Sequence, residues 1–153
     1  MRNPQLLILC FAISACERTP TLEAVAPPVE HASANASVAC PSQEFSRFAE
    51  AFSESQEIQM AFTEYPLEMQ QLDTQAMPEP KPFTSRLQRH QIEFPIIPNK
   101  AKRMAKALRL RVEQLEPGRA KLTLMQDDSD YLVEYFFRRD ACWKLVSVDN
   151  QSL

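Results

Sequence analysis

Apolar and polar residues alternate along the carboxy-terminal third of the chain. In residues 108–115 (LRLRVEQL), Leu108, Leu110 and Val112 fall on one side of an extended chain and the charged residues fall on the other. Similar stretches follow at residues 120–126, 131–139 and 142–148. Turn-forming sequences separate them, at residues 116–119 (EPGR), 127–130 (DDSD) and 140–141. The pattern predicts four antiparallel strands in a meander.

A different spacing of apolar residues comes earlier in the chain. Phe45, Phe48 and Phe52 recur at intervals of three and four residues, which predicts a helix with one aromatic face. Ser42 is the expected N-cap of this helix, and Glu44 falls in its first turn.

A second short helix is expected next, because Ser53 and Gln56 have the spacing of a capping box. We expect it to end before Tyr65-Pro66.

The middle of the chain has weaker patterns. Residues 68–82 are polar and end in PEPKP, so we expect a surface loop. Residues 83–97 predict one or two extended segments, broken by proline, and residues 99–107 a short helical turn. Helices that precede a strand meander predict an α+β fold, with amino-terminal helices packed on a curved antiparallel sheet.

The amino terminus has the pattern of an export signal. Leu6 to Ile13 is an apolar run of eight residues, too short to span a bilayer, which needs about 20. Its end, Ile13-Ser14-Ala15-Cys16, resembles the lipobox of bacterial lipoprotein precursors. That resemblance implies cleavage before Cys16 and lipidation of its thiol. An ordinary secretory signal and a cytosolic helix remain as alternatives.

The export signal defines the expected organisation of the chain. Residues 1–15 are a signal peptide, residues 16–39 a lipidated cysteine with a disordered tether, and residues 40–153 one α+β domain. The tether has no aromatic residue and is rich in Pro, Ala and Ser. Glu17 is not the Asp that favours inner-membrane retention in the lipoprotein family. We therefore expect a periplasm-facing domain on the outer membrane.

Composition excludes several functions. Gly118 is the one glycine in 153 residues, which argues against glycine-rich phosphate loops and the G-x-S-x-G nucleophile motif. The net charge of −3 becomes −4 when Arg2 leaves with the signal, so nucleic acid is a poor candidate partner.

Cysteine usage predicts a disulfide. Cys10 leaves with the signal and Cys16 carries the lipid, which leaves Cys40 and Cys142 of the four cysteines. In an exported protein such a pair is expected to form a bridge. Two reduced, buried thiols are the alternative, and zinc is disfavoured because neither cysteine has a Cys or His neighbour at ligand spacing.

The domain also resembles small exported proteins of the nuclear-transport-factor-2-like fold. The resemblance rests on the Phe-rich first helix, on Phe62 to Leu67 (FTEYPL) and on the closing stretch WKLVSV. It implies a cone-shaped α+β domain over residues 42–150. Proteins of that fold include isomerases, polyketide cyclases and many non-catalytic binding modules, so the fold does not give the function.

The sequence contains no convincing catalytic or metal site. His90 has polar neighbours and reads as a surface residue, and Tyr131 and Tyr135 share a strand face as core or partner contacts. Asp127, Asp128 and Asp130 do not match the EF-hand pattern. We therefore predict no catalytic residue, no cofactor and no metal.

Basic residues are concentrated in one stretch, which predicts a partner-binding surface. Acidic residues dominate the first helices. A solvated surface without a partner is the alternative. The basic residues are Lys100, Lys102, Arg103, Lys106, Arg109 and Arg111, and the acidic ones are Glu44, Glu50, Glu54, Glu57 and Glu64.

These features together predict a lipid-anchored, non-catalytic binding domain in the bacterial envelope. The most specific form of this hypothesis is an immunity protein, which binds and neutralises an antibacterial effector acting in the envelope. An envelope assembly lipoprotein and a small-molecule isomerase or cyclase are the alternatives. For the enzyme, Tyr135 and His90 would be the acid–base groups.

Overall fold

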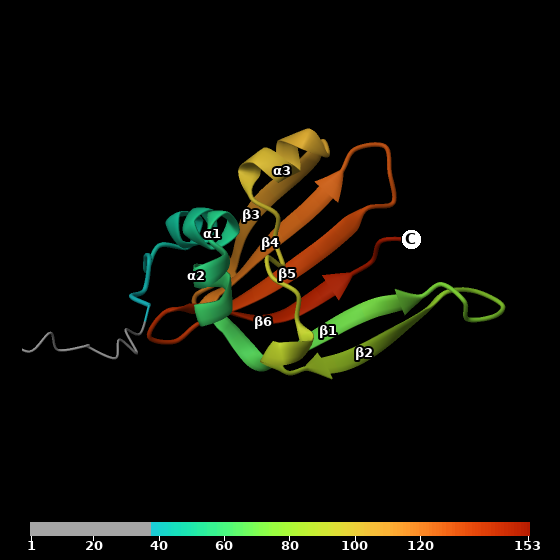
Figure 1. Cartoon of the computed structure of the whole chain (residues 1–153), viewed down its shortest axis with the longest axis horizontal. Helices are drawn as coiled ribbons and strands as arrows, with labels where there is room; N and C mark the ends of the chain where they lie inside the picture. The colour runs from blue at the N-terminus through green and yellow to red at the C-terminus, as the bar shows by residue number, and fades with distance from the viewer. Residues whose placement is uncertain (1–37) are drawn as a thin grey trace, which may run out of the picture. The chain divides into compact units, whose positions relative to one another are not determined.

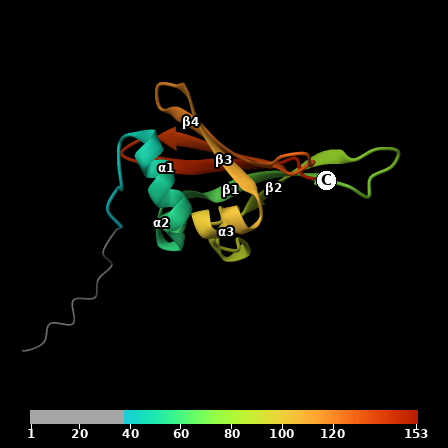
Figure 2. The same ribbon diagram turned by 90° about the horizontal axis from the view of Figure 1, so that it is seen from above.

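The computed structural model describes residues 38–153. The predicted lipidation site, Cys16, and nearly all of the predicted tether lie outside these residues. The described chain forms a six-stranded sheet with three short α-helices on one of its faces, as the two views show (Figures 1 and 2). This is the expected α+β class.

The predicted meander is confirmed. Strands β3 (Leu108–Glu116), β4 (Arg119–Gln126), β5 (Leu132–Arg139) and β6 (Trp143–Asn150) pair as antiparallel neighbours in that order. Gly118 has a φ of 79° in the turn between β3 and β4, a left-handed conformation that glycine adopts without steric cost.

The sheet is larger than predicted and is not wholly antiparallel. Strand β1 (Thr63–Asp73) pairs with β2 (Lys81–Leu87) and, in parallel, with β6. The expected loop over residues 68–82 is therefore wrong, because most of it lies in this hairpin. Tyr65-Pro66 lies inside β1 and does not end the second helix. Polar residues on both faces of the hairpin hid the strands from a pattern-based prediction.

The two amino-terminal helices form where expected, with different caps. Helix α1 (Phe45–Glu54) is capped by the Glu44 carboxylate, which accepts from the backbone N–H groups of Ser46 and Arg47. The predicted N-cap, Ser42, instead accepts from the Glu44 N–H. The N-cap of helix α2 (Gln56–Ala61) is Ser55 and not the predicted Ser53.

The aromatic face of α1 builds the core. Phe45, Phe48 and Phe52 are at most 3% exposed and pack on the sheet. The ring centroids of Phe45 and Trp143 are 4.8 Å apart, and those of Phe52 and Phe137 are 5.2 Å apart. Burial of several large rings fixes α1 against β5 and β6.

A disulfide joins Cys40 to Cys142, as predicted, and holds the segment before α1 against the β5–β6 turn. The same junction is hydrogen-bonded. Gln43 Nε2 donates to the Ala141 carbonyl (2.8 Å), and the Trp143 indole N–H donates to the Gln43 carbonyl (2.9 Å).

Helix α3 (Lys100–Ala105) forms over the expected residues 99–107, with Asn99 as its N-cap. It follows a 3₁₀ turn, η1 (Arg89–Gln91), and an irregular segment that crosses the same sheet face. No helix in residues 38–153 combines the length and apolar composition needed to cross a membrane.

Candidate binding site

The sheet face that carries the helices also carries a hollow of about 490 Å³, here called the sheet hollow. Residues from β1, β5 and β6 form its floor, and the segment after β2 forms its wall. The lining residues are Met69, Gln71, Leu87, Gln91, Ile92, Glu93, Pro95, Ile96, Tyr131, Val133, Tyr135, Val148 and Asn150. Apolar side chains share this lining with the amides of Gln71, Gln91 and Asn150, the hydroxyls of two tyrosines and the Glu93 carboxylate, so its surface is largely polar.

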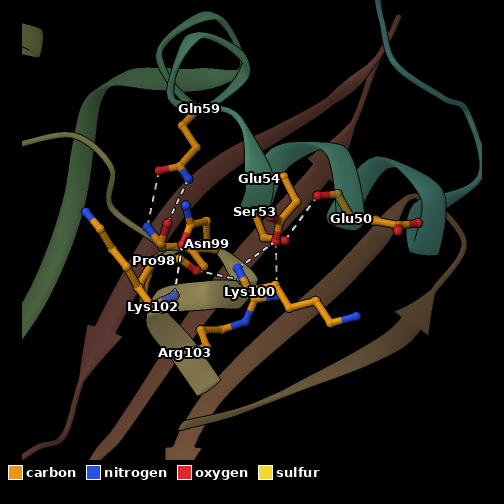
Figure 3. A network of polar contacts seen from close by, with 10 residues as sticks. Glu50, Ser53, Glu54, Gln59, Pro98, Asn99, Lys100, Lys102 and Arg103 are labelled. Atoms are coloured by element: carbon orange, nitrogen blue, oxygen red, sulfur yellow. Dashed lines mark hydrogen bonds and ion pairs between the residues drawn. The ribbon is translucent and has the colours of Figure 1, made fainter. Parts of the chain in front are cut away.

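One buried glutamine holds the wall of this hollow. Gln59 of α2 is fully buried, and its Oε1 accepts from the N–H groups of Ile96 (2.6 Å) and Ile97 (3.2 Å). Its Nε2 donates to the Ile97 carbonyl (2.9 Å). These bonds satisfy backbone groups of the irregular segment, as strand partners would. Figure 3 shows contacts from the Gln59 amide to this segment as dashed lines. Sequence analysis did not identify Gln59; its one local signal is a polar residue between Ile58 and Met60.

Tyr135 holds the same wall from the sheet side. It is 3% exposed, and its hydroxyl donates to the Ile96 carbonyl at 3.3 Å. Burial, the larger cause, and the nearby Tyr131 hydroxyl raise the pKa of Tyr135 far above its ordinary value. The phenol therefore stays protonated and serves as a hydrogen-bond donor at neutral pH.

His90 lies elsewhere. It is exposed on η1 and borders a different surface hollow, with Met60, Arg89, Ile92 and Phe94. The structure therefore does not bring His90 together with Tyr135 as an acid–base pair.

A second hollow of about 660 Å³ lies beside α3. We call it the α3 groove. It shares Pro95 and Tyr131 with the sheet hollow, so the two form neighbouring parts of one surface. Its lining is Pro95, Pro98, Lys102, Lys106, Leu108, Gln126 and Tyr131.

The six predicted basic residues separate into two groups. The three arginines have carboxylate partners within the domain: Arg103 pairs with Glu54, Arg109 with Asp127, and Arg111 with Glu113. Lys100, Lys102 and Lys106 are exposed and make no ion pair within residues 38–153. The lysines are therefore the cations available to a partner.

Glu54 explains part of the predicted charge pattern. Its carboxylate accepts from the Lys100 backbone N–H at 2.8 Å and lies 3.4 Å from the Arg103 guanidinium. Arg103 also donates to the Pro98 carbonyl at 2.6 Å. Figure 3 shows this junction of α1 with α3, with Lys100 and Lys102 extending to opposite sides of it. The Glu54–Arg103 ion pair therefore joins α1 to α3 within the domain.

The acidic turn between β4 and β5 does not gather a set of metal ligands in the described chain. Asp127 is paired with Arg109, and nowhere in residues 38–153 do three His, Cys, Asp or Glu side chains converge as metal ligands would.

Comparison with known proteins gives a fold and no family. No family model matches the chain, and no curated protein matches it. Among solved structures it is similar to an NTF2-like protein from Bacteroides fragilis, with a TM-score of 0.53 and 16% identity. The similarity covers 72% of this chain and 47% of that one, so the chain spans about half the length of that protein. The likeness supports the nuclear-transport-factor-2-like fold and says nothing specific about activity.

Proposed function

We propose that this protein is a lipid-anchored, non-catalytic binding domain that faces the periplasm, and most specifically an immunity protein against an envelope-targeting antibacterial effector. The observation that carries the proposal is the α3 groove. It combines two lysines, which have no ion-pair partner in the described chain, with an apolar floor. Cations beside exposed apolar surface are suited to bind a partner of opposite charge.

The anchor follows from the lipobox Ile13–Cys16. Several acyl chains on Cys16 would give stable membrane attachment, which a single chain does not. Residues 16–39 would hold the domain away from the bilayer, on the outer membrane in preference to the inner one.

Palmitate labelling in the native host tests the anchor. Cys16→Ser should abolish labelling and release the protein from membranes. Cys10→Ser is the matched control, because it changes a cysteine that leaves with the signal and should keep both labelling and attachment. Unchanged membrane association of Cys16→Ser would contradict the lipoprotein assignment.

A protection assay tests the immunity function. Deleting the gene should make cells sensitive to attacking kin that deliver the cognate effector, and expression from a plasmid should restore survival. A toxin encoded by the adjacent gene is the first effector to try. Equal survival of deletion and parent strains under attack would contradict immunity, and recovery only within a large envelope complex would favour an assembly role.

The sheet hollow supports a second candidate, a small-molecule isomerase or cyclase. Its volume suits a small ligand, and Tyr135 is one of its lining residues. The exposed position of His90 weakens this candidate. Turnover of a ketosteroid that is lost in Tyr135→Phe would favour it over the binding domain.

A further inference from the structure

We infer that the α3 groove receives an extended acidic segment of the protein partner, with carboxylates on Lys102 and Lys106 and one apolar side chain between Pro95 and Tyr131. This inference rests on the proposed binding function and names the chemistry of its partner. The charge of the groove, its shape and the hydrogen bonds that hold its walls suit it to dock a peptide.

The charge argument starts from helix geometry. Lys102 and Lys106 are four residues apart, so they occupy neighbouring positions on one face of α3 and its last turn. Two ammonium groups at this spacing repel each other. The groove contributes no carboxylate of its own, because its other lining residues are Pro95, Pro98, Leu108, Gln126 and Tyr131. An external anion would relieve that repulsion.

Two carboxylates beside the elements that form the groove are already paired within the domain. Asp127, next to the lining residue Gln126, pairs with Arg109. Glu54 faces α3 from α1, and it is used by Arg103 and by the Lys100 N–H. The domain therefore neutralises the three arginines of the basic stretch, whereas Lys102 and Lys106 have no ion-pair partner within residues 38–153.

Shape distinguishes a peptide from a flat membrane. Lys102 and Lys106 border a hollow of about 660 Å³. The shared residues Pro95 and Tyr131 continue the apolar floor toward Val133 and Ile96. A bilayer surface could reach the ammonium groups but could not fill the hollow, whereas a peptide side chain could.

The groove is also rigid, which lowers the entropic cost of binding. Its wall is held by Gln59 through three hydrogen bonds and by Tyr135 through one. Helix α3 is held by the Asn99 cap and by Arg103, which bonds to the Pro98 carbonyl and pairs with Glu54.

Peptide binding by the full chain, purified in detergent with its disulfide intact, tests the inference. The probe is a fluorescein-labelled peptide of Asp and Glu with one central leucine, followed by fluorescence anisotropy. Replacing its acids by Asn and Gln, or its leucine by Ser, should each weaken binding. Added salt should weaken it too, because the contact is between charged groups.

The variants are matched for charge. The double variant K102E/K106E should weaken peptide binding by at least about tenfold, because two attractive contacts become repulsive. The control K81E/K144E changes the net charge equally at lysines outside the groove and should bind as the parent does. Equal loss in both variants, or binding of phosphatidylglycerol vesicles but not of the peptide, would overturn the inference.

The protection assay separates this inference from the proposed function. Loss of protection in K102E/K106E, with protection kept in K81E/K144E, supports both. If K102E/K106E still protects a strain that deletion makes sensitive, the immunity function is supported and binding of the effector at the α3 groove is contradicted. If the peptide binds at the lysines but the parent protein protects against no effector, acidic-peptide binding by the α3 groove is supported and the immunity function is contradicted.

Discussion

Gln59 shows how much one buried polar side chain contributes to this domain. It is surrounded by protein, and all of its hydrogen bonds go to backbone groups of Ile96 and Ile97. A segment without strand partners can lie in the interior only if its backbone N–H and C=O groups find other hydrogen-bond partners.

Gln59→Leu should therefore be strongly destabilising. The change keeps the size of the side chain but leaves the N–H groups of Ile96 and Ile97 without acceptors, at a cost of about 3 kcal/mol. Urea unfolding followed by Trp143 fluorescence measures it. Gln56→Leu, at an exposed position of the same helix, is the control and should change stability by less than about 0.5 kcal/mol. Equal stability of both variants would contradict the role of Gln59.

Tyr135 predicts how stability depends on pH. Its pKa is raised in the folded state, so above pH ~10 the unfolded chain loses this proton while the folded chain keeps it. The free energy of unfolding should fall as pH rises, with a contribution from this group of up to about 1.4 kcal/mol per pH unit. In Tyr135→Phe the fall between pH 9 and 11 should be shallower. Tyr131→Phe should flatten it less, because Tyr131 is only partly buried. Parallel pH curves for Tyr135→Phe and the parent would contradict the assignment.

Among the elements, α3 depends on a side chain from α1. Six residues form few internal hydrogen bonds, so a helix as short as α3 needs contacts outside itself. Glu54 supplies them by capping the Lys100 N–H and pairing with Arg103.

Glu54→Ala should loosen α3 while the sheet stays intact. The loss of a capping acceptor costs about 1 kcal/mol. Hydrogen exchange of the amides in residues 100–105 should become faster, and exchange in β5 should not change. Glu50→Ala, one turn earlier on α1, is the control, because it removes an exposed carboxylate that makes no ion pair within residues 38–153. Slow exchange of α3 in Glu54→Ala would show that the helix does not depend on this contact.

Local pattern predicts elements well only where each strand shows a buried and an exposed side. The alternation from Leu108 onward gave the meander, and the Phe45 spacing gave α1. The β1–β2 hairpin was missed because Gln70, Gln71 and the flanking residues carry no alternation. Strand β1 joins the sheet by pairing with β6, which is more than 70 residues away in the sequence.

The candidate site was predictable only in part, because contacts between residues distant in sequence decide which of its charges are free. The basic cluster is visible as composition, but the sequence cannot show that Arg103 meets Glu54 or that Arg109 meets Asp127, since both pairs form only on folding. The choice of Lys102 and Lys106 as available cations needs the structure.

At the scale of the whole molecule, the disulfide closes nearly the entire domain. Cys40 and Cys142 are 102 residues apart in sequence and join the segment before α1 to the β5–β6 turn. A bridge over a loop of that length restricts the unfolded chain strongly.

Removing the bridge should lower the free energy of unfolding by about 2 to 5 kcal/mol. The double variant Cys40→Ser/Cys142→Ser and the parent in dithiothreitol should unfold at the same urea concentration, below that of the oxidised parent. As an internal control, the urea concentration at which the double variant unfolds should not change when dithiothreitol is added. An oxidised parent no more stable than the reduced one would contradict the prediction.

The central place of β6 has a consequence for the time course of folding. This strand lies between β1 and β5, and β1 with β2 has no other partner in the sheet. During synthesis, the first hairpin must therefore wait for the last strand before the sheet can close. Contacts between such distant segments make folding slow, and they leave the growing chain without its native core until Trp143–Asn150 has emerged. The growing chain therefore cannot close this sheet before β6 itself has been synthesised.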